Sequence, residues 1–248
     1  SDFAGSTLVH ACGGAAALAG VIVLGAREGR FGSKGEKRSM VPFAASSIPL
    51  VTLGTFLLWF GWFGFNGFSQ LAMGTFDDVN AISKIAVNTH LAGAAGTVAG
   101  ATITRLMAGK TDIVMMLNGA LAGLVAITAE PLTPSPLLAI LIGFVGALIM
   151  YFGTKFLESQ RLDDVVGAIP VHMFAGIFGT LVVPASNPET NFGTQFLGVI
   201  SVCVFSFVLS YFVFRSMKAT IGLRISKEAE KLGTDKAEVG VVAYSIRD

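Results

Sequence analysis

Residues 2–14 read DFAGSTLVHACGG, and residues 164–176 read DVVGAIPVHMFAG. Both stretches fit the pattern D-x-x-G-x-x-x-V-H-x-x-x-G, so one aspartate, two glycines, one valine and one histidine recur at the same spacing. Five such matches can also arise by chance in a chain rich in Gly and Val. We interpret the pattern as an internal repeat, which predicts two equivalent membrane segments that each carry one histidine.

The composition requires a surface that is buried in lipid. Hydrophobic residues make up 53% of the 248 residues and charged residues 13%, with a mean hydropathy of +0.71. Soluble domains carry about 25% charge, and about 20 apolar residues cross a hydrocarbon layer of about 30 Å. We therefore predict an all-α polytopic membrane protein, with a pore region at 1–217 and a polar tail at 218–248. The seven expected helices are 4–25, 49–68, 82–107, 113–129, 136–157, 166–184 and 193–217.

Basic residues predict the orientation of these spans. The connecting segments 69–81, 130–135 and 185–192 contain no Lys or Arg, and only Lys84 lies near their side. Since Lys and Arg concentrate in cytoplasmic loops, we expect the first residue outside, the tail in the cytoplasm and the protein in the plasma (inner) membrane. The chain begins at Ser1 without a signal peptide, which favours a fragment that lacks earlier spans; a natural seven-helix protein is the alternative.

The composition also disfavours several other classes of protein. A net charge of +1 provides no large basic face for nucleic acid. Cys12 and Cys203 both lie within apolar stretches, so they indicate buried side chains rather than a disulfide framework or a metal site. We find no nucleophile–base pair and no cofactor motif, and we expect neither an enzyme nor a bound cofactor.

The predicted orientation makes the two repeat copies antiparallel, as in transporters whose site lies near the midplane. His10 and His172 each follow their aspartate by eight residues. Each imidazole then lies roughly 12 Å below its own surface, which leaves the two about 6 Å apart along the membrane normal. Such a pair can share or pass a proton. The alternative is that both histidines only pack against neighbouring helices. We interpret His90 as such a packing residue, because it lacks the motif.

Aromatic residues crowd the end of the second span, where residues 57–69 read LLWFGWFGFNGFS. Part of this cluster fits an interfacial aromatic belt. It also fits a pore mouth, because an aromatic face attracts a cation by as much as about 2 kcal/mol when desolvated. Asn66 and Ser69 are expected to add hydrogen bonds to a substrate there.

Several blocks of this sequence resemble the ammonium transporter family (Amt/Mep/Rh). They are DFAGSTLVH, LGTFLLWFGWFGFN, LNGALAGLVAITA, LDDVVGAIPVH and GLRISKEAE. The resemblance covers nearly the whole chain. It implies an eleven-helix, inverted-repeat fold of which this chain is spans five to eleven, a homotrimer with one pore per subunit, and ammonium or ammonia, with methylammonium as a further candidate, as the substrate.

The resemblance also assigns roles to individual residues. Asp2 resembles the acidic residue that supports the outer recruitment site, and His10 and His172 resemble the twin histidines of the pore. Phe65 resembles a gate phenylalanine, Trp62 a pore-lining tryptophan and Ser69 the serine of the outer vestibule.

Two departures from the family pattern affect the vestibule and the tail. The motif GFNGGS is GFNGFS here, which places Phe68 beside Ser69. In the tail Asp235 and Tyr244 are kept, but Val239 and Val241 replace a histidine and a glutamate. Contact of this tail with neighbouring subunits or with a PII-type regulatory protein is implied by analogy only.

We therefore expect a channel-type transporter that moves ammonium nitrogen through a hydrophobic pore with a central histidine pair. An ammonium sensor built on the same fold is the alternative. An unrelated seven-helix receptor is disfavoured, because a retinal protein needs a buried Lys in its last span and 193–217 has only terminal basic residues. The sequence leaves open whether ammonia or ammonium crosses.

Overall fold

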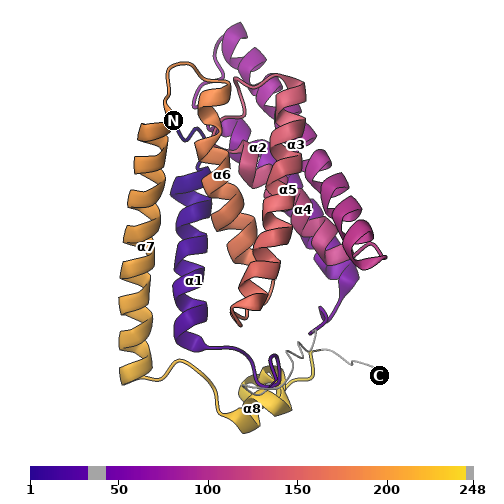
Figure 1. Ribbon diagram of the computed structural model, residues 1–248, viewed down its shortest axis with the longest axis vertical. Coiled ribbons are helices and arrows are strands. Elements are labelled where there is room, and N and C mark those ends of the chain that lie inside the picture. The colour runs from indigo at the N-terminus through magenta and orange to yellow at the C-terminus, as the bar shows by residue number, and fades with distance from the viewer. Residues whose placement is uncertain (33–42, 244–248) are drawn as a thin grey trace.

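The computed structural model describes residues 1–32 and 43–243, which form a bundle of helices (Figure 1). Part of the basic segment 26–47 and Tyr244 lie outside the described residues. Within the described ranges the chain forms helices and no β-strand. The elements are η1 (Ser6–Ala11), α1 (Cys12–Leu24), α2 (Ile48–Phe68), α3 (Phe76–Ala108), α4 (Ile113–Ile127), α5 (Pro136–Ser159), η2 (Ile169–Phe174), α6 (Ala175–Leu181), η3 (Val183–Ala185), α7 (Phe192–Thr220), α8 (Lys227–Leu232) and η4 (Asp235–Val239).

Each of the seven predicted ranges contains helix, although the segments differ in length and polarity. Four helical segments in the described part of the chain are long and apolar enough to cross a membrane: Ser6–Leu24, α2, α5 and α7. The segments Ile113–Ile127 and Ile169–Ala185 are apolar but shorter. Helix α3 is 33 residues long and does not meet the same apolar criterion.

Local capping explains where α3 begins, six residues before the predicted start at 82. The Thr75 side chain accepts a hydrogen bond from the backbone N–H of Asp78, and the Asp78 carboxylate accepts one from the backbone N–H of Thr75. This reciprocal arrangement satisfies N–H groups that a helix start otherwise leaves free. Asp77 and Asp78 lie in this first turn. Their low hydropathy is why the hydropathy pattern does not predict helix there.

Helices α3, α4 and α5 pack against one another through glycine contacts. A Cβ atom added to Gly96 would lie 2.2 Å from the carbonyl oxygen of Gly119, and one added to Gly143 would lie 2.1 Å from that of Ala92. Small residues let helix backbones approach closely in lipid. These three helices therefore form the tightly packed part of the bundle, and α2 packs on α3 and α4.

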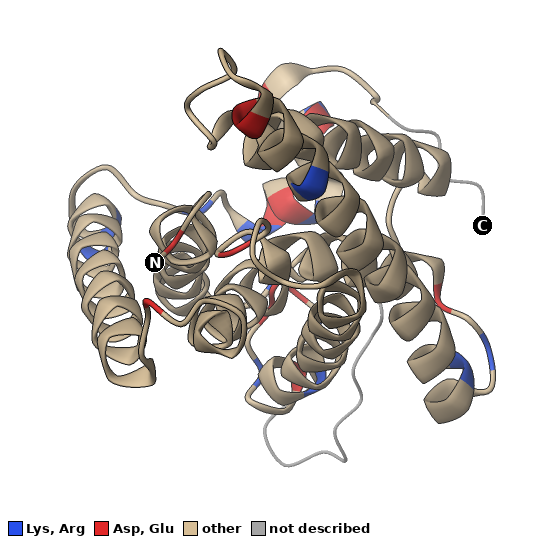
Figure 2. Cartoon of the chain, turned by 90° about the horizontal axis from the view of Figure 1, so that it is seen from above, with Lys and Arg blue, Asp and Glu red and all other residues tan. Residues whose placement is uncertain are grey.

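Helices α1 and α7 lie side by side at one edge of the bundle, and α6 packs between α7 and the group of α4 and α5 (Figure 1). The first residue lies at one end of the bundle, and α8 lies at the opposite end. Seen from above, charged residues are few and are found mainly near helix ends and in connecting segments (Figure 2). This distribution leaves long apolar helix surfaces, as expected for a protein in lipid.

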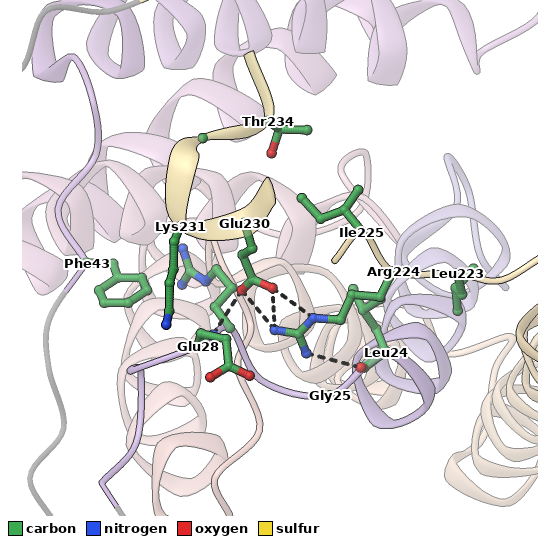
Figure 3. Close-up of a pocket in the computed structure, with 12 residues that line it drawn as sticks. Leu24, Gly25, Glu28, Phe43, Leu223, Arg224, Ile225, Glu230, Lys231 and Thr234 are labelled. Carbon is green, nitrogen blue, oxygen red and sulfur yellow. Dashed lines mark hydrogen bonds and ion pairs between the residues drawn. The ribbon is translucent and has the colours of Figure 1, made fainter. Parts of the chain in front are cut away.

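At the end that carries α8, the tail contacts the segment that follows α1 (Figure 3). Arg224 forms an ion pair of 2.8 Å with Glu230, whose carboxylate also accepts the backbone N–H of Glu28. Lys218 donates to the carbonyl oxygen of Val23. Arg224, Glu230 and Glu28 line a cavity of about 560 Å³, and the contacts together fix the start of the tail beneath α1.

Candidate functional site

Both repeat copies form the same local structure, a short π-helical turn that carries the histidine. Gly5 and Gly167 precede the turns with φ values of 103° and 74°, which favour glycine. The Asp2 carboxylate accepts the backbone N–H groups of Thr7 and Leu8, at 3.1 and 2.8 Å. The repeat motif thus builds a capped turn, and π-helical turns occur frequently at functional sites.

In the second copy the aspartate has the same function. The Asp164 carboxylate accepts the backbone N–H groups of Ala168 and Ile169, at 3.0 and 2.7 Å. The aspartate, glycine and histidine of the motif therefore serve one geometry in both copies. For Asp2, burial raises the pKa of the carboxyl above its ordinary value, although the N–H groups of Leu8 and Thr7 act to lower it.

The structure brings His10 and His172 together. Their Nδ1 atoms lie 3.1 Å apart, and the ring centroids are 5.2 Å apart with 22° between the planes. Since two neutral imidazoles joined through Nδ1 share one hydrogen, one ring donates and the other accepts. Nε2 of His10 is buried without a hydrogen-bond partner. Both rings border an open groove of about 240 Å³, whose other lining residues are Val9, Gly13, Gly14, Ala17 and Ala168.

Trp62 and Phe65 extend this pair into an aromatic cluster. The Trp62 ring stacks on His10 with centroids 5.0 Å apart and 18° between the planes. Phe65 lies 5.6 Å from His10 and 5.9 Å from Trp62, measured between ring centroids. Trp62 is 6% exposed and Phe65 is 40% exposed. Four of the predicted site residues, the two histidines and these two aromatic residues, are thus contiguous.

Asn66, which we expect to bond a substrate, has its partners inside the protein. Its side chain is fully buried, with 0% exposure. The amide nitrogen donates to the Thr89 hydroxyl at 3.0 Å, and the amide oxygen lies 3.2 Å from the Thr128 hydroxyl. Both ends of the amide are therefore used inside the protein, where α2, α3 and α4 meet.

Ser69 ends α2 and is half-buried. Its hydroxyl donates to the carbonyl oxygen of Phe65 at 2.8 Å, which leaves lone pairs on Oγ that can accept from a cation. The neighbouring Phe68 is 77% exposed. The third histidine, His90, is exposed and stacks on Phe63 with ring centroids 6.2 Å apart.

The comparisons with known proteins decide the family. A family model described as "Ammonium Transporter Family" matches residues 1–244. Ammonium transporter Amt2 of Archaeoglobus fulgidus is 41% identical over an alignment of 263 positions, which covers 98% of this chain and 55% of that protein. The chain belongs to the ammonium transporter family. A putative ammonium transporter of Synechocystis is also 41% identical, over 96% of this chain and 54% of the relative.

Solved structures of the ammonium transporter family share this fold. A structure titled "Sensor Amt Protein" has a TM-score of 0.88 and 35% identity, covering 96% of this chain and 60% of its own. Mep2 of Candida albicans has a TM-score of 0.79 and 27% identity, covering 96% and 55%. The chain therefore spans about half the length of the relatives it matches. The curated relatives are named as transporters rather than enzymes, and the chain is an all-helical membrane protein of this family.

The sequence analysis did not single out Thr128, although Thr128 contacts two of the predicted site residues, Trp62 and Asn66. Its hydroxyl accepts from the indole N–H of Trp62 at 2.8 Å and lies beside Asn66. A threonine in a helix commonly donates to its own helix, as this one does to the carbonyl oxygen of Leu124. The sequence around it therefore gives no signal of a second partner.

Proposed function

We propose that this chain forms part of a channel-type transporter that moves ammonium nitrogen across a membrane through a pore lined by His10 and His172. The observation that carries the proposal is the 3.1 Å contact between their Nδ1 atoms, which joins the two copies of one motif. An ionisable residue inside a membrane segment points to function. Here two such residues meet at a groove whose other walls are Gly, Ala and Val.

The outer part of the proposed path attracts a cation. The face of Phe65 and the free lone pairs of Ser69 can hold ammonium through a cation–π contact and a hydrogen bond, while Trp62 lies buried between Phe65 and His10. The Asp2 carboxylate supports this region through the backbone, because it is occupied by the N–H groups of Thr7 and Leu8. Asp2 therefore acts on the shape of the recruitment site and does not need to touch the substrate.

Loss of a proton resolves the cost of moving a charge through the apolar part. A Lys at the bilayer centre costs about 2.5–3.5 kcal/mol even on insertion scales. In the proposed step one N–H bond of ammonium breaks, its electron pair stays on nitrogen as ammonia, and the proton passes to an imidazole nitrogen. When His10 donates its Nδ1–H to His172, Nε2 of His10 holds a lone pair and can accept that proton.

The same step excludes potassium without a size filter, because potassium has no proton to give up. Methylammonium keeps N–H bonds and is expected to pass if its methyl group fits the groove. Net transport is electrogenic in this proposal if the proton follows the ammonia through the histidine pair.

The membrane arrangement is part of the proposal. We place the protein in the plasma (inner) membrane with residue 1 outside and the tail in the cytoplasm, because the basic residues concentrate on the side of the tail. The homotrimer is proposed from the family resemblance alone. The tail surface between 221 and 243 is where a PII-type protein would bind. Val239 is 72% exposed and Val241 58% exposed there, so such a contact would be apolar at these positions.

A sensor of ammonium is the second candidate, and one observation favours it. The structure titled "Sensor Amt Protein" superposes with a TM-score of 0.88. A sensor keeps the binding site at Phe65 and Ser69 and passes little or no nitrogen. The two functions therefore differ in flux rather than in the outer site.

The test measures flux in liposomes that contain the full natural protein carrying this sequence. Ammonium pulses and potassium pulses of equal concentration are applied, and the current and the internal pH are recorded. We expect a response to ammonium that persists in excess potassium, and no response to potassium alone. Saturable ammonium binding without flux would replace the transporter by the sensor, and equal responses to both cations would reject both.

A further inference from the structure

The buried residue Thr128 makes two kinds of contact at the centre of the bundle, one through its side chain and one through its backbone. It ends α4 and is 0% exposed. Its hydroxyl oxygen lies 2.8 Å from the indole Nε1 of Trp62. Its carbonyl oxygen accepts the backbone N–H of Ala4 at 3.0 Å.

The side-chain contact is fully determined by the groups around the hydroxyl. The indole N–H of Trp62 can only donate, so Thr128 Oγ1 must accept from it. The single hydroxyl hydrogen then points to the carbonyl oxygen of Leu124 at 2.7 Å or to the amide oxygen of Asn66 at 3.2 Å. Asn66 in turn is held by Thr89. Since Asn66, Thr89 and Thr128 are all 0% exposed, water does not compete for these bonds.

The backbone contact connects the same residue to the first histidine. Ala4 and Phe3 donate their backbone N–H groups to the carbonyl oxygens of Thr128 and Ala129. These two residues lie directly before the π-helical turn that carries His10. Thr128 thus holds Trp62 with its side chain and the chain leading to His10 with its backbone.

We propose that Thr128 is a positioning residue for transport, which sets the stack of Trp62 on His10. The two rings lie 5.0 Å apart and nearly parallel, at 18°. An indole can rotate about its side-chain torsions, and the bond from Nε1 to Thr128 fixes which face it presents. Asn66 and Thr89 extend this support to α2 and α3. The inference rests on the proposed function, because it assigns a role within that same pathway.

Thr128→Val is the main variant, since valine has a similar shape and removes the hydroxyl while the backbone carbonyl stays. Flux in liposomes with the full natural protein is expected to fall roughly tenfold, the size of effect that an unpartnered buried N–H produces. Thr128→Ser should restore flux to within about twofold of wild type. Thr55→Val is the matched control, because Thr55 is buried and its hydroxyl bonds only to Val51 of its own helix.

A double-variant comparison separates positioning from general packing. If Thr128 acts through Trp62, Thr128→Val should cost nothing further in a Trp62→Phe background, where the indole N–H is gone. Ultraviolet resonance Raman spectra report separately on the hydrogen bond of the indole N–H. Subtracting the Trp62→Phe spectrum from the wild-type spectrum isolates the signal of Trp62. We expect its N–H marker to shift in Thr128→Val and to remain in Thr55→Val. Thr128→Cys, whose thiol is a weak acceptor, replaces the valine variant if that variant does not fold.

The outcomes distinguish this inference from the function it rests on. Wild-type flux together with a Thr128→Val variant as active as wild type would overturn the inference alone. Additive losses in the two backgrounds would also overturn it, because they would show that Thr128 acts independently of Trp62. A wild type that carries no ammonium would instead overturn the proposed function, and this role with it.

Discussion

At the scale of single residues, the positions of the two histidines are set by the aspartate and glycine of their motif. His10 and His172 occur at equal distances from an aspartate and a glycine, and each aspartate caps the turn that holds its histidine. Equal spacings give the two histidines equivalent places in their turns, and the proposed entry of the two copies from opposite surfaces would place the rings at similar depth. This is why a short sequence motif was sufficient to predict that the two imidazoles would meet.

Ser69 and Asn66 should behave differently when changed. Ser69→Ala removes a lone-pair acceptor of the proposed outer site and is expected to weaken the apparent affinity for ammonium roughly three- to tenfold, the effect of a typical net hydrogen bond of about 0.5–1.5 kcal/mol. The protein should melt at nearly the wild-type temperature. Apparent affinity from flux against ammonium concentration and a thermal melt in detergent check this; an unchanged affinity would contradict the role of Ser69.

Asn66→Leu should act on stability instead. It removes the amide that donates to the Thr89 hydroxyl in a fully buried region, while Thr128 keeps Trp62 and Leu124 as partners. We expect this change to destabilise the protein by about 1–3 kcal/mol. Thermal melting in detergent measures the loss, with Ser69→Ala as the comparison. A stable Asn66→Leu protein with lower ammonium affinity would restore the original prediction that Asn66 faces the substrate.

At the scale of elements, the close approach of α3, α4 and α5 depends on glycine. Gly143→Ala would place a methyl group 2.1 Å from the carbonyl oxygen of Ala92, so α5 must move away from α3. We expect a large loss of thermal stability, of about 1–3 kcal/mol or more, as for other overpacked interiors. Gly198→Ala in α7 is the control because its added Cβ would have no atom within 4 Å. Equal melting temperatures for both variants would refute this packing.

The differences between the predicted and observed elements have physical causes. Hydropathy located the apolar parts of all seven segments but not the polar start of α3, because Thr75 and Asp78 form a cap that hydropathy does not detect. On α2, successive residues are about 100° apart, so Asn66 lies about 100° round from Phe65. That rotation turns Asn66 toward α3 and α4, which only the tertiary packing reveals.

Thr128 shows the same limit at the candidate site. Sequence analysis identifies the histidines because histidine is rare in membrane spans and recurs in the motif. It identifies Trp62 and Phe65 because aromatic residues are dense at the end of the second span. A threonine among apolar residues is neither. Its role depends on α2 and α4 lying against each other, which is a property of the bundle and not of the local sequence.

At the scale of the whole molecule, an ion pair joins the segment after α1 to the residue that precedes the second repeat copy, at the end that carries the tail. Asp163, whose side chain is 2% exposed, bonds Arg27 at 2.8 Å and lies 3.5 Å from Arg30. Burial alone would raise the pKa of the Asp163 carboxyl, but the hydrogen bonds and charge of Arg27 lower it below its ordinary value. This residue directly precedes Asp164, which caps the turn of His172.

The pH dependence of stability follows from that lowered pKa. An acid whose pKa is lower in the folded state stabilises the protein above its unfolded pKa of about 3.9, and the contribution is lost as the pH falls further. Asp163→Asn should therefore destabilise the protein by about 1–3 kcal/mol at pH 7, and by less below about pH 4. Thermal melting at pH 7 and pH 3 measures this, with exposed Glu189→Gln as the control. A difference that grows on acidification would contradict the assignment.

The histidine pair is proposed to select ammonium over potassium, and one flux ratio tests that selection. Ammonium and potassium fluxes are measured side by side for the full natural protein and for its His10→Ala variant in liposomes, at matched protein content. We predict that the wild type passes ammonium and excludes potassium, and that His10→Ala either loses the ammonium flux or admits potassium. A His10→Ala variant with wild-type ammonium flux that still excludes potassium would contradict the account.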